Sequence, residues 1–148
     1  MVNYDIYISA PLFNEMEVEF NNKVDAFVRN LGFTTYLPQR DGGEDEKLLR
    51  NPELYPEASR RVFERDVQAL KNSRILLMLI DGRVPDEGAC VELGMAYAYN
   101  KICIGFQTDI RKFSGMQNNL MIDYSFTYNI AHTWDELREI LLKIKNLK

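Results

Sequence analysis

The chain has 148 residues, of which 46% are hydrophobic and 27% are charged, and its formal net charge is −4. This length suits one domain with a sizeable core, so we expect residues 1–148 to form a single domain. The acidic balance excludes a general basic surface of the kind that holds nucleic acid, and no apolar run is long enough to span a membrane.

The cysteine and histidine residues indicate the cellular compartment and exclude some kinds of catalytic site. Cys90 and Cys103 both lie in apolar runs, which indicates buried thiols in a reducing compartment rather than a disulfide framework. The N-terminus leads directly into a strand-like run, so no signal peptide is expected and the predicted location is cytoplasmic. The single histidine, His132, argues against a histidine-based metal site or a serine–histidine triad.

The first half of the chain alternates strand and helix patterns. Residues 4–9 are rich in β-forming side chains, and residues 14–31 carry apolar side chains at helical spacing, with Asn14 as the predicted N-cap and Gly32 as the stop. Residues 33–37 predict a second strand, closed by Pro38. Residues 39–51 are polar and predict a surface loop, and residues 53–72 predict a second long helix.

The second half repeats the alternation. Residues 74–80 form the most continuous apolar run, which is typical of a central parallel strand covered on both faces. Residues 81–99 predict an acidic turn and then a helix that is apolar nearly all round. A fourth strand is expected at 102–106 and a fifth within 126–132, beyond a polar loop and a short apolar segment at 119–122. Thr133 is predicted to cap a last helix, with Glu136 completing a capping box.

This order of elements predicts an α/β fold. We expect a flavodoxin-like, doubly wound, five-stranded parallel sheet of strand order 2-1-3-4-5, with helices on both faces. In such sheets ligands bind beyond the carboxyl ends of the strands, at the switch point between strands 1 and 3. That rule places residues 9–13 beside residues 81–92 in one cleft.

The most unusual residue of the chain is Glu92, a carboxylate inside an apolar helix. No basic residue lies three or four positions from it, and burying an unpaired charge is costly. Two interpretations stay open: a partner elsewhere in the fold, or a catalytic carboxylate held away from water. Tyr7 alternates with Ile6 and Ile8 on the first strand, so it either fills the core or points its hydroxyl at Glu92.

Other candidate residues also allow two readings. Asp86 is a helix N-cap, and it could contact a ligand as well. Asp66, near the end of a charged helix, is by position a solvated acid. Phe13 is either core or a stacking platform, and the segment 119–121 is either an irregular turn or a ligand contact. Neither G-x-G-x-x-G nor G-x-x-x-x-G-K-[ST] occurs, so dinucleotide and triphosphate fingerprints are absent from the sequence.

Four segments resemble motifs of the nucleoside 2-deoxyribosyltransferase family, in the same order and spacing over about the first 122 residues. They are IYISAPLF at 6–13, RDVQAL at 65–70, DEGACVELG at 86–94 and NLM at 119–121. The resemblance implies an enzyme that transfers the 2-deoxyribosyl group between purine and/or pyrimidine bases of free 2′-deoxynucleosides, in nucleoside salvage. The transfer would be retaining and ping-pong, through a covalent deoxyribosyl–Glu92 intermediate.

The resemblance also implies the role of each catalytic residue. Glu92 would be the nucleophile, Tyr7 would orient it, and Asp66 would contact the base and move a proton to or from a ring nitrogen. Some family members end in a long tail that reaches the base. This chain stops at Lys148, so proton delivery is expected to depend more on Asp66. Neither a metal nor a cofactor is expected.

The substrate-binding residues follow in the same way. Asp86 would accept a hydrogen bond from the sugar 5′-hydroxyl, and Gly88 would let the backbone approach the sugar. Asn119, from a neighbouring subunit, would hold the sugar hydroxyls, so a homo-oligomer is expected. The remaining contacts would come from Phe13 stacking near the base, Leu12 beside it, and Met121. The expected partners are 2′-deoxynucleosides and free nucleobases, without nucleic acid or membrane.

Two rival functions remain. The first is a 2′-deoxynucleoside 5′-monophosphate N-glycosidase of the same fold. Those hydrolases carry a small hydroxyl residue six positions before the catalytic glutamate and a serine in place of the asparagine before the methionine, both suited to phosphate. Here these positions are Asp86 and Asn119, and a carboxylate would repel a phosphate dianion. The second is a non-enzymatic flavodoxin-like binding module, in which Glu92 is a structural acid.

Overall fold

The sheet of this protein is parallel and has four strands. The computed structural model describes residues 3–43, 48–109, 118–127 and 130–146. Within them the strands lie in the order β2-β1-β3-β4, with β1 and β3 at the centre. Their bounds are β1 (Tyr4–Ser9), β2 (Thr35–Tyr36), β3 (Ser73–Leu79) and β4 (Ile102–Phe106). The predicted α/β class and the order of the first four strands are confirmed.

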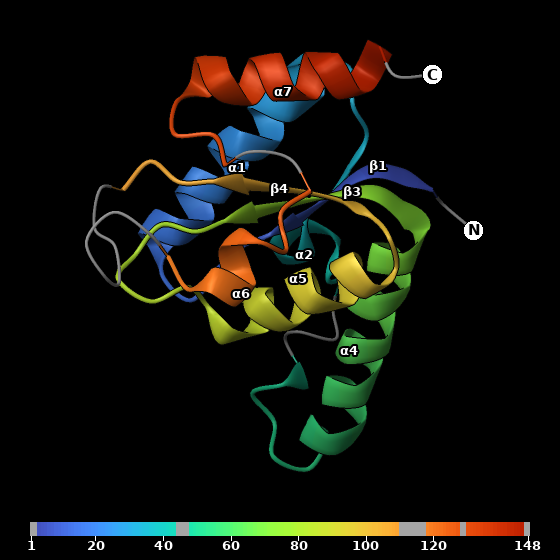
Figure 1. Cartoon of the computed structure of the whole chain (residues 1–148). Helices are drawn as coiled ribbons and strands as arrows, with labels where there is room; N and C mark the ends of the chain where they lie inside the picture. Colours follow the sequence, from blue (N-terminus) through green and yellow to red (C-terminus); the bar gives the residue numbers. More distant parts are fainter. Residues whose placement is uncertain (1–2, 44–47, 110–117, 128–129, 147–148) are drawn as a thin grey trace.

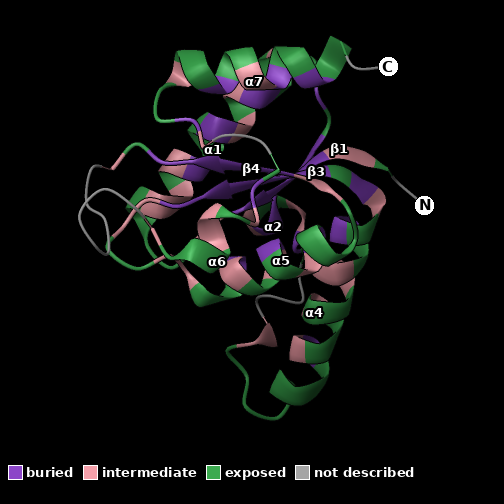
Figure 2. Cartoon of the chain, in the orientation of Figure 1, coloured by how far each residue is buried: buried purple, intermediate pink, exposed green. Residues whose placement is uncertain are grey.

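Helices cover both faces of the sheet, as Figure 1 shows. One face carries α1 (Glu15–Asn30) and α7 (Trp134–Asn146), and the other carries α4 (Tyr55–Asn72), α5 (Glu87–Ala98) and the short α6 (Leu120–Asp123). A single helical turn, α2 (Pro38–Asp41), follows β2. The N-terminal half of α4 extends beyond the sheet and is largely exposed (Figure 2).

The alternation of side chains along β1 divides the core in two. Ile6 and Ile8 point into the cluster under α1 and α7, whereas Tyr7 points into the cluster under α4 and α5, and all three are fully buried. The same alternation sends Ser9 to the side of Tyr7. Strand β1 therefore delivers two hydroxyl side chains, two residues apart, to the face covered by α5.

Most of the predicted boundaries are confirmed by their caps. The Asn14 side chain accepts from Glu17 N at 3.0 Å at the start of α1. At the start of α7, Thr133 Oγ1 accepts from Glu136 N at 3.2 Å, and Glu136 Oε2 accepts from His132 N at 2.7 Å. These reciprocal bonds form the predicted capping box. Both cysteines are free thiols, with Cys103 buried and Cys90 half-buried.

The predicted fifth strand is the main correction to the fold. Within the described residues it is a single parallel bridge between Phe106 and Ala131, and residues 128–129 lie outside the described ranges. Ala131 exchanges backbone bonds with Gly105 O and Gln107 N, both at 2.9 Å. At the other end of β4, Cys103 N donates to the Thr127 side chain at 2.8 Å instead of to a backbone carbonyl. A side-chain oxygen thus takes the place of a regular strand ladder.

Two further details concern single segments. The predicted loop 39–51 begins with the turn α2, because Pro38 occupies the first helical position, where its missing N–H costs nothing; residues 44–47 lie outside the described ranges. None of the helices in the described part of the chain is long and apolar enough to cross a membrane.

Candidate active site

Glu92 lies where α5 passes the carboxyl end of β1, and two hydroxyl groups hold its carboxylate. The Tyr7 hydroxyl donates to Oε1 at 2.7 Å, and the Ser9 hydroxyl donates to Oε2 at 2.6 Å. Tyr7 and Ser9 are fully buried and come from the same face of β1. Of the two interpretations of Glu92, the structure therefore supplies a partner from another element, and this partner is a pair of neutral donors rather than a cation.

The protonation of Glu92 reflects a competition between burial and these donors. Burial raises the pKa of Glu92 to about 6, and the negative charges of Asp66 and Asp86 act in the same direction. The hydrogen bonds from Ser9 and Tyr7 favour the carboxylate and lower the pKa. At pH 7 most of the population is therefore ionised, desolvated and held in one orientation.

Tyr7 remains a donor throughout. Burial, together with the charge of Glu92, raises the pKa of Tyr7 far above its usual range. Its phenol is therefore neutral at every pH at which the fold is expected to persist. A neutral hydroxyl can stabilise the carboxylate without neutralising it.

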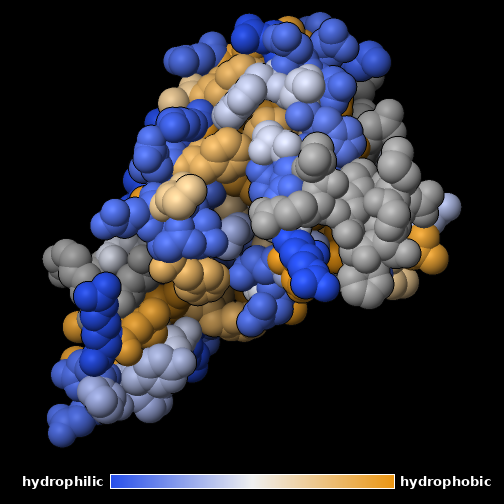
Figure 3. Space-filling model, turned by 90° about the vertical axis from the view of Figure 1, so that its left-hand side faces the viewer, coloured by the Kyte–Doolittle hydropathy of each residue, from blue (hydrophilic) through white to orange (hydrophobic). Residues whose placement is uncertain are grey.

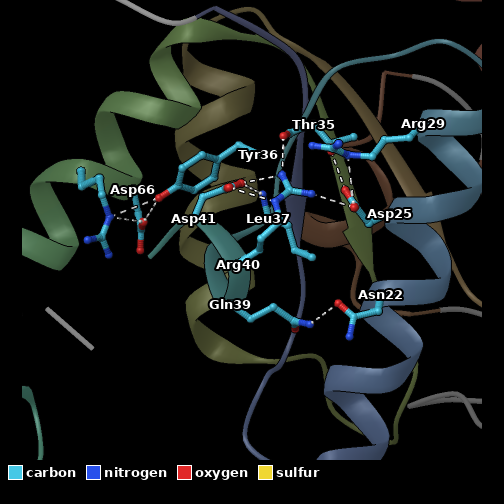
Figure 4. Close-up of polar contacts among 11 residues, drawn as sticks. Asn22, Asp25, Arg29, Thr35, Tyr36, Leu37, Gln39, Arg40, Asp41 and Asp66 are labelled. Carbon is cyan, nitrogen blue, oxygen red and sulfur yellow. Dashed lines mark hydrogen bonds and ion pairs between the residues drawn. The ribbon is translucent and has the colours of Figure 1, made fainter. Parts of the chain in front are cut away.

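A second carboxylate, Asp66, lies close to this pair. The Tyr36 hydroxyl donates to Asp66 Oδ1 at 2.6 Å, as Figure 4 shows. The Tyr36 ring stacks on the Tyr7 ring with centroids 5.3 Å apart. Burial raises the pKa of Asp66, against the opposing effects of the Tyr36 hydrogen bond and the Arg65 charge. Asp66 is therefore no solvated surface acid, which corrects the interpretation based on its position alone.

Both acids line one cavity of about 240 Å³. Its other lining residues are Gly88 and five apolar side chains, Phe63, Val67, Leu70, Val91 and Met95. The molecule is seen in Figure 3 from the side at which the strands end, and hydrophobic residues gather there between hydrophilic ones. Two carboxyl groups against an apolar wall suit a ligand with a flat, weakly polar part and a reacting polar centre.

Asp86 is the N-cap of α5, as the sequence suggested. Its Oδ2 accepts from Ala89 N at 2.8 Å. A β-carbon on Gly88 would lie 3.1 Å from that same oxygen, so glycine keeps the cap uncrowded at the rim of the cavity. The charge of Asp86 is the smallest of the influences that raise the pKa of Glu92. Asp86 itself is not among the residues that line the cavity of Glu92.

The structure does not bring the remaining predicted residues into this cavity. Asn119 caps α6 through a 2.9 Å bond to Met121 N, and it lines a different cavity of about 370 Å³ with Cys90 and Ile122. Met121 and Phe13 are 78% and 77% exposed. Leu12 is half-buried in the turn after β1. Within one described chain, none of these four lines the cavity of Glu92.

Several residues of the site were not predicted from the sequence, among them Ser9, Tyr36 and Phe63. Ser9 was placed near the cleft, but a neutral residue at a strand end carries no signal of its contact with Glu92. Tyr36 lies on a strand too short to reveal which way it faces. Phe63 belongs to the helix predicted over residues 53–72, but it is 61% exposed and lines the cavity. Within the described ranges, no three His, Cys, Asp or Glu side chains gather to hold a metal ion.

Comparisons with known proteins show the family of the chain. The sequence profile of the nucleoside 2-deoxyribosyltransferase family matches residues 6–123, which include both acids, Tyr7 and Asn119. The chain therefore belongs to the nucleoside 2-deoxyribosyltransferase family. No curated protein sequence matches it.

Solved structures show the same fold. A 2-deoxyribosyltransferase from the psychrotolerant bacterium Bacillus psychrosaccharolyticus is 28% identical, with a TM-score of 0.71 over 89% of this chain and 88% of that one. A 2-deoxyribosyltransferase from Leishmania mexicana is 17% identical, with a TM-score of 0.67 over 93% and 96%. A CMP N-glycosidase from Clostridium botulinum is 15% identical, with a TM-score of 0.51 over 95% and 97%. The last two establish similarity of fold alone.

Proposed function

We propose that this protein transfers the 2-deoxyribosyl group between the bases of free 2′-deoxynucleosides in nucleoside salvage. One observation carries the proposal: Glu92 is a desolvated carboxylate, held at both oxygens by Tyr7 and Ser9, in a cavity shared with a second acid. Family membership supports nucleosides and nucleobases as the substrate class.

In the first half-reaction, a Glu92 oxygen attacks the anomeric carbon of the donor nucleoside. The new C–O ester bond forms as the glycosidic C–N bond breaks, and the bonding pair of that bond leaves with the base. Asp66 gives its proton to a ring nitrogen of the departing base and becomes a carboxylate. The transition state resembles an oxocarbenium ion, which the negative charge of Glu92 stabilises at short range in a dry site.

The second half-reaction reverses these movements with another base. A ring nitrogen of the acceptor attacks the anomeric carbon, Glu92 leaves as a carboxylate, and the acceptor returns a proton to Asp66. Two inversions at one carbon give overall retention. Water can replace the acceptor, so slow hydrolysis is expected when no base is present.

Asp86 is the proposed hydrogen-bond acceptor for the sugar 5′-hydroxyl. Its Oδ2 caps α5, and Oδ1 can accept a hydrogen bond from a substrate hydroxyl. A 5′-phosphate in the same place would meet a carboxylate and the nearby charge of Glu92, which disfavours a nucleotide substrate. This argues for free nucleosides over the 5′-monophosphate N-glycosidase alternative.

A second copy of the chain is the proposed source of the remaining contacts. Asn119 is the N-cap of α6 and Met121 lies on it. Leu120, Met121 and the C-cap Tyr124 are 62%, 78% and 81% exposed. Large apolar side chains exposed together on one short helix favour burial against a partner. We propose a homo-oligomer in which Asn119 and Met121 enter the cavity of a neighbour, with Phe13 and Leu12 at its edge near the base.

The proposal is tested by base exchange. The protein is mixed with deoxyinosine and adenine, and the nucleosides are separated by chromatography. Deoxyadenosine and hypoxanthine should appear in equal amounts, and Glu92→Ala should abolish both while preserving the circular dichroism spectrum. Deoxyinosine 5′-monophosphate with adenine is the matched control for Asp86. If the monophosphate reacts as fast as the nucleoside, or if no deoxyadenosine forms near neutral pH, the proposed function is wrong.

A further inference from the structure

The Tyr36 hydroxyl accepts one hydrogen bond and donates another. Arg65 Nε donates to the Tyr36 hydroxyl oxygen at 3.3 Å, and a guanidinium has donors but no acceptor. The hydroxyl therefore keeps its own proton for Asp66 Oδ1, 2.6 Å away. Burial and the contact with Asp66 raise the pKa of Tyr36 well above its usual range, so the phenol stays a donor.

Because Tyr36 donates to Asp66, it determines which oxygen of neutral Asp66 carries the carboxyl proton. A neutral carboxyl group has one O–H donor and one acceptor oxygen. Because Oδ1 already accepts from Tyr36, the proton of neutral Asp66 belongs on Oδ2. Among the residues that the structure describes, no hydrogen bond reaches Oδ2, and Asp66 lines the cavity that holds Glu92.

We propose that Tyr36 is a positioning residue for Asp66, whose hydroxyl fixes the proton of neutral Asp66 on Oδ2, the oxygen free to serve the base. This inference rests on the proposed function. The proton passes from Oδ2 to a ring nitrogen as the glycosidic C–N bond breaks, and the acceptor base returns a proton to Oδ2 in the second half-reaction.

The structure holds the Tyr36 side chain in place for this task. Its ring stacks on the Tyr7 ring with centroids 5.3 Å apart and makes a T-shaped contact with the Tyr4 ring at 5.4 Å. The neighbouring backbone is anchored by Arg40, which donates to Thr35 O at 2.7 Å (Figure 4). The hydroxyl therefore has little freedom to turn away from Asp66.

Groups on four elements, α4, β2, α5 and β1, influence the charge of Asp66. Arg65 on α4 and the Tyr36 hydroxyl on β2 favour its carboxylate, whereas burial favours the neutral acid. Glu92 on α5 and Tyr7 on β1 lie within electrostatic reach of Asp66. Replacing Tyr36 by phenylalanine removes one donor to the carboxylate, so the pKa of Asp66 rises and its proton is free to occupy either oxygen.

Two donor nucleosides separate this role from simple packing. Deoxyinosine requires a proton on its leaving base, whereas 7-methyl-2′-deoxyguanosine carries a cationic base that leaves without one. For Tyr36→Phe we expect the first-turnover release of hypoxanthine from deoxyinosine, measured by rapid quench, to fall by about tenfold or more. The first-turnover release of 7-methylguanine from the methylated donor should change by less than about twofold, because that step needs no proton from Asp66. Asp66→Asn should show the same selective loss.

Tyr4→Phe is the matched control, since it removes a phenol hydroxyl from a ring that packs on Tyr36 without bonding Asp66. It should leave both rates unchanged. The ratio of the two rates within each variant does not depend on the fraction of folded protein. Equal losses for both donors, or no loss with deoxyinosine, would overturn the role of Tyr36. A native protein that exchanges neither donor would instead overturn the proposed function, and the inference with it.

Discussion

Ser9 and Tyr7 set the charge state of Glu92. Burial alone would push this carboxyl towards its neutral form, in which it could not attack the sugar. Each hydroxyl opposes burial by donating to one oxygen, and both are fully buried, so neither hydrogen bond is weakened by water. Among the described residues, two neutral donors thus keep Glu92, the proposed nucleophile, ionised. A cation in their place would stabilise the ground state and slow the proposed attack.

Removing the Ser9 hydroxyl should shift this balance. In Ser9→Ala the pKa of Glu92 rises above about 6, because one donor to the carboxylate is lost. The acid limb of kcat/KM for the donor nucleoside, measured from pH 5 to 9, should move up by about one unit. Ser73→Ala is the matched control, since Ser73 is also buried in the sheet but donates to Ala69 O. An acid limb that stays in place would show that Ser9 does not act on Glu92.

The raised pKa of Glu92 also predicts a cost in stability. A carboxyl group whose pKa rises from 4.5 to about 6 on folding favours the native state below pH 4.5 and loses that contribution as the pH passes 6. Glu92→Gln should therefore raise the free energy of unfolding by roughly 2 kcal/mol at pH 8 relative to pH 4.5. Urea denaturation at the two pH values measures this difference. An equal effect at both pH values would contradict a desolvated, ionised Glu92.

At the scale of elements, the turn α2 is fixed by one arginine. Arg40 donates to Asp25 of α1 at 2.7 Å, to Thr35 O of β2 at 2.7 Å and to Asp41 of α2 at 2.6 Å. Figure 4 shows these contacts beside the Tyr36–Asp66 pair. Gln39 is equally committed, with its amide bonded to Val18 O and Asn22. Arg40 and Gln39 therefore tie the end of β2 and the turn α2 to α1.

Arg40→Ala should accordingly destabilise the protein more than loss of an ordinary surface ion pair. The expected loss is about 2 kcal/mol, since two partly buried carboxylates and a carbonyl lose their shared donor. Lys23→Ala is the control, because Lys23 pairs with Glu19 at 2.9 Å on the exposed face of α1 and should cost less than about 1 kcal/mol. Chemical denaturation of both variants at pH 7 gives the comparison. Equal losses would show that the network does not brace β2.

For the whole molecule, the sequence predicted what depends on periodicity and missed what depends on contacts across elements. The parallel sheet follows from the alternation of strand and helix patterns. The residues alone left open whether Tyr7 fills the core or reaches Glu92, and the structure shows a buried ring whose hydroxyl bonds Glu92. The role of Tyr36 could not be predicted, because a strand of two residues has too short an alternation to show which face of the sheet each side chain takes. The predicted fifth strand was wrong: within the described residues one bridge joins Ala131 to β4, and Cys103 N donates to the Thr127 side chain.

The proposed shared site makes a prediction for mixtures of variants. Glu92→Ala and Asn119→Ala should each be nearly inactive. After the two are unfolded together and refolded, about a quarter of the sites should combine an intact Glu92 with an intact Asn119 from a neighbour. Exchange activity should return to about that share. Refolding each variant alone is the control, and a mixture as inactive as its parts would contradict a site built from two chains.

The central claim is that Glu92 carries the sugar between bases. The most direct test is to incubate the protein with deoxyinosine without an acceptor, quench with acid, digest it and measure the peptide masses. The peptide containing Glu92 should gain one deoxyribosyl group, and subsequent addition of adenine before the quench should remove it. A peptide that never gains this mass, while base exchange proceeds at its full rate, would contradict the account.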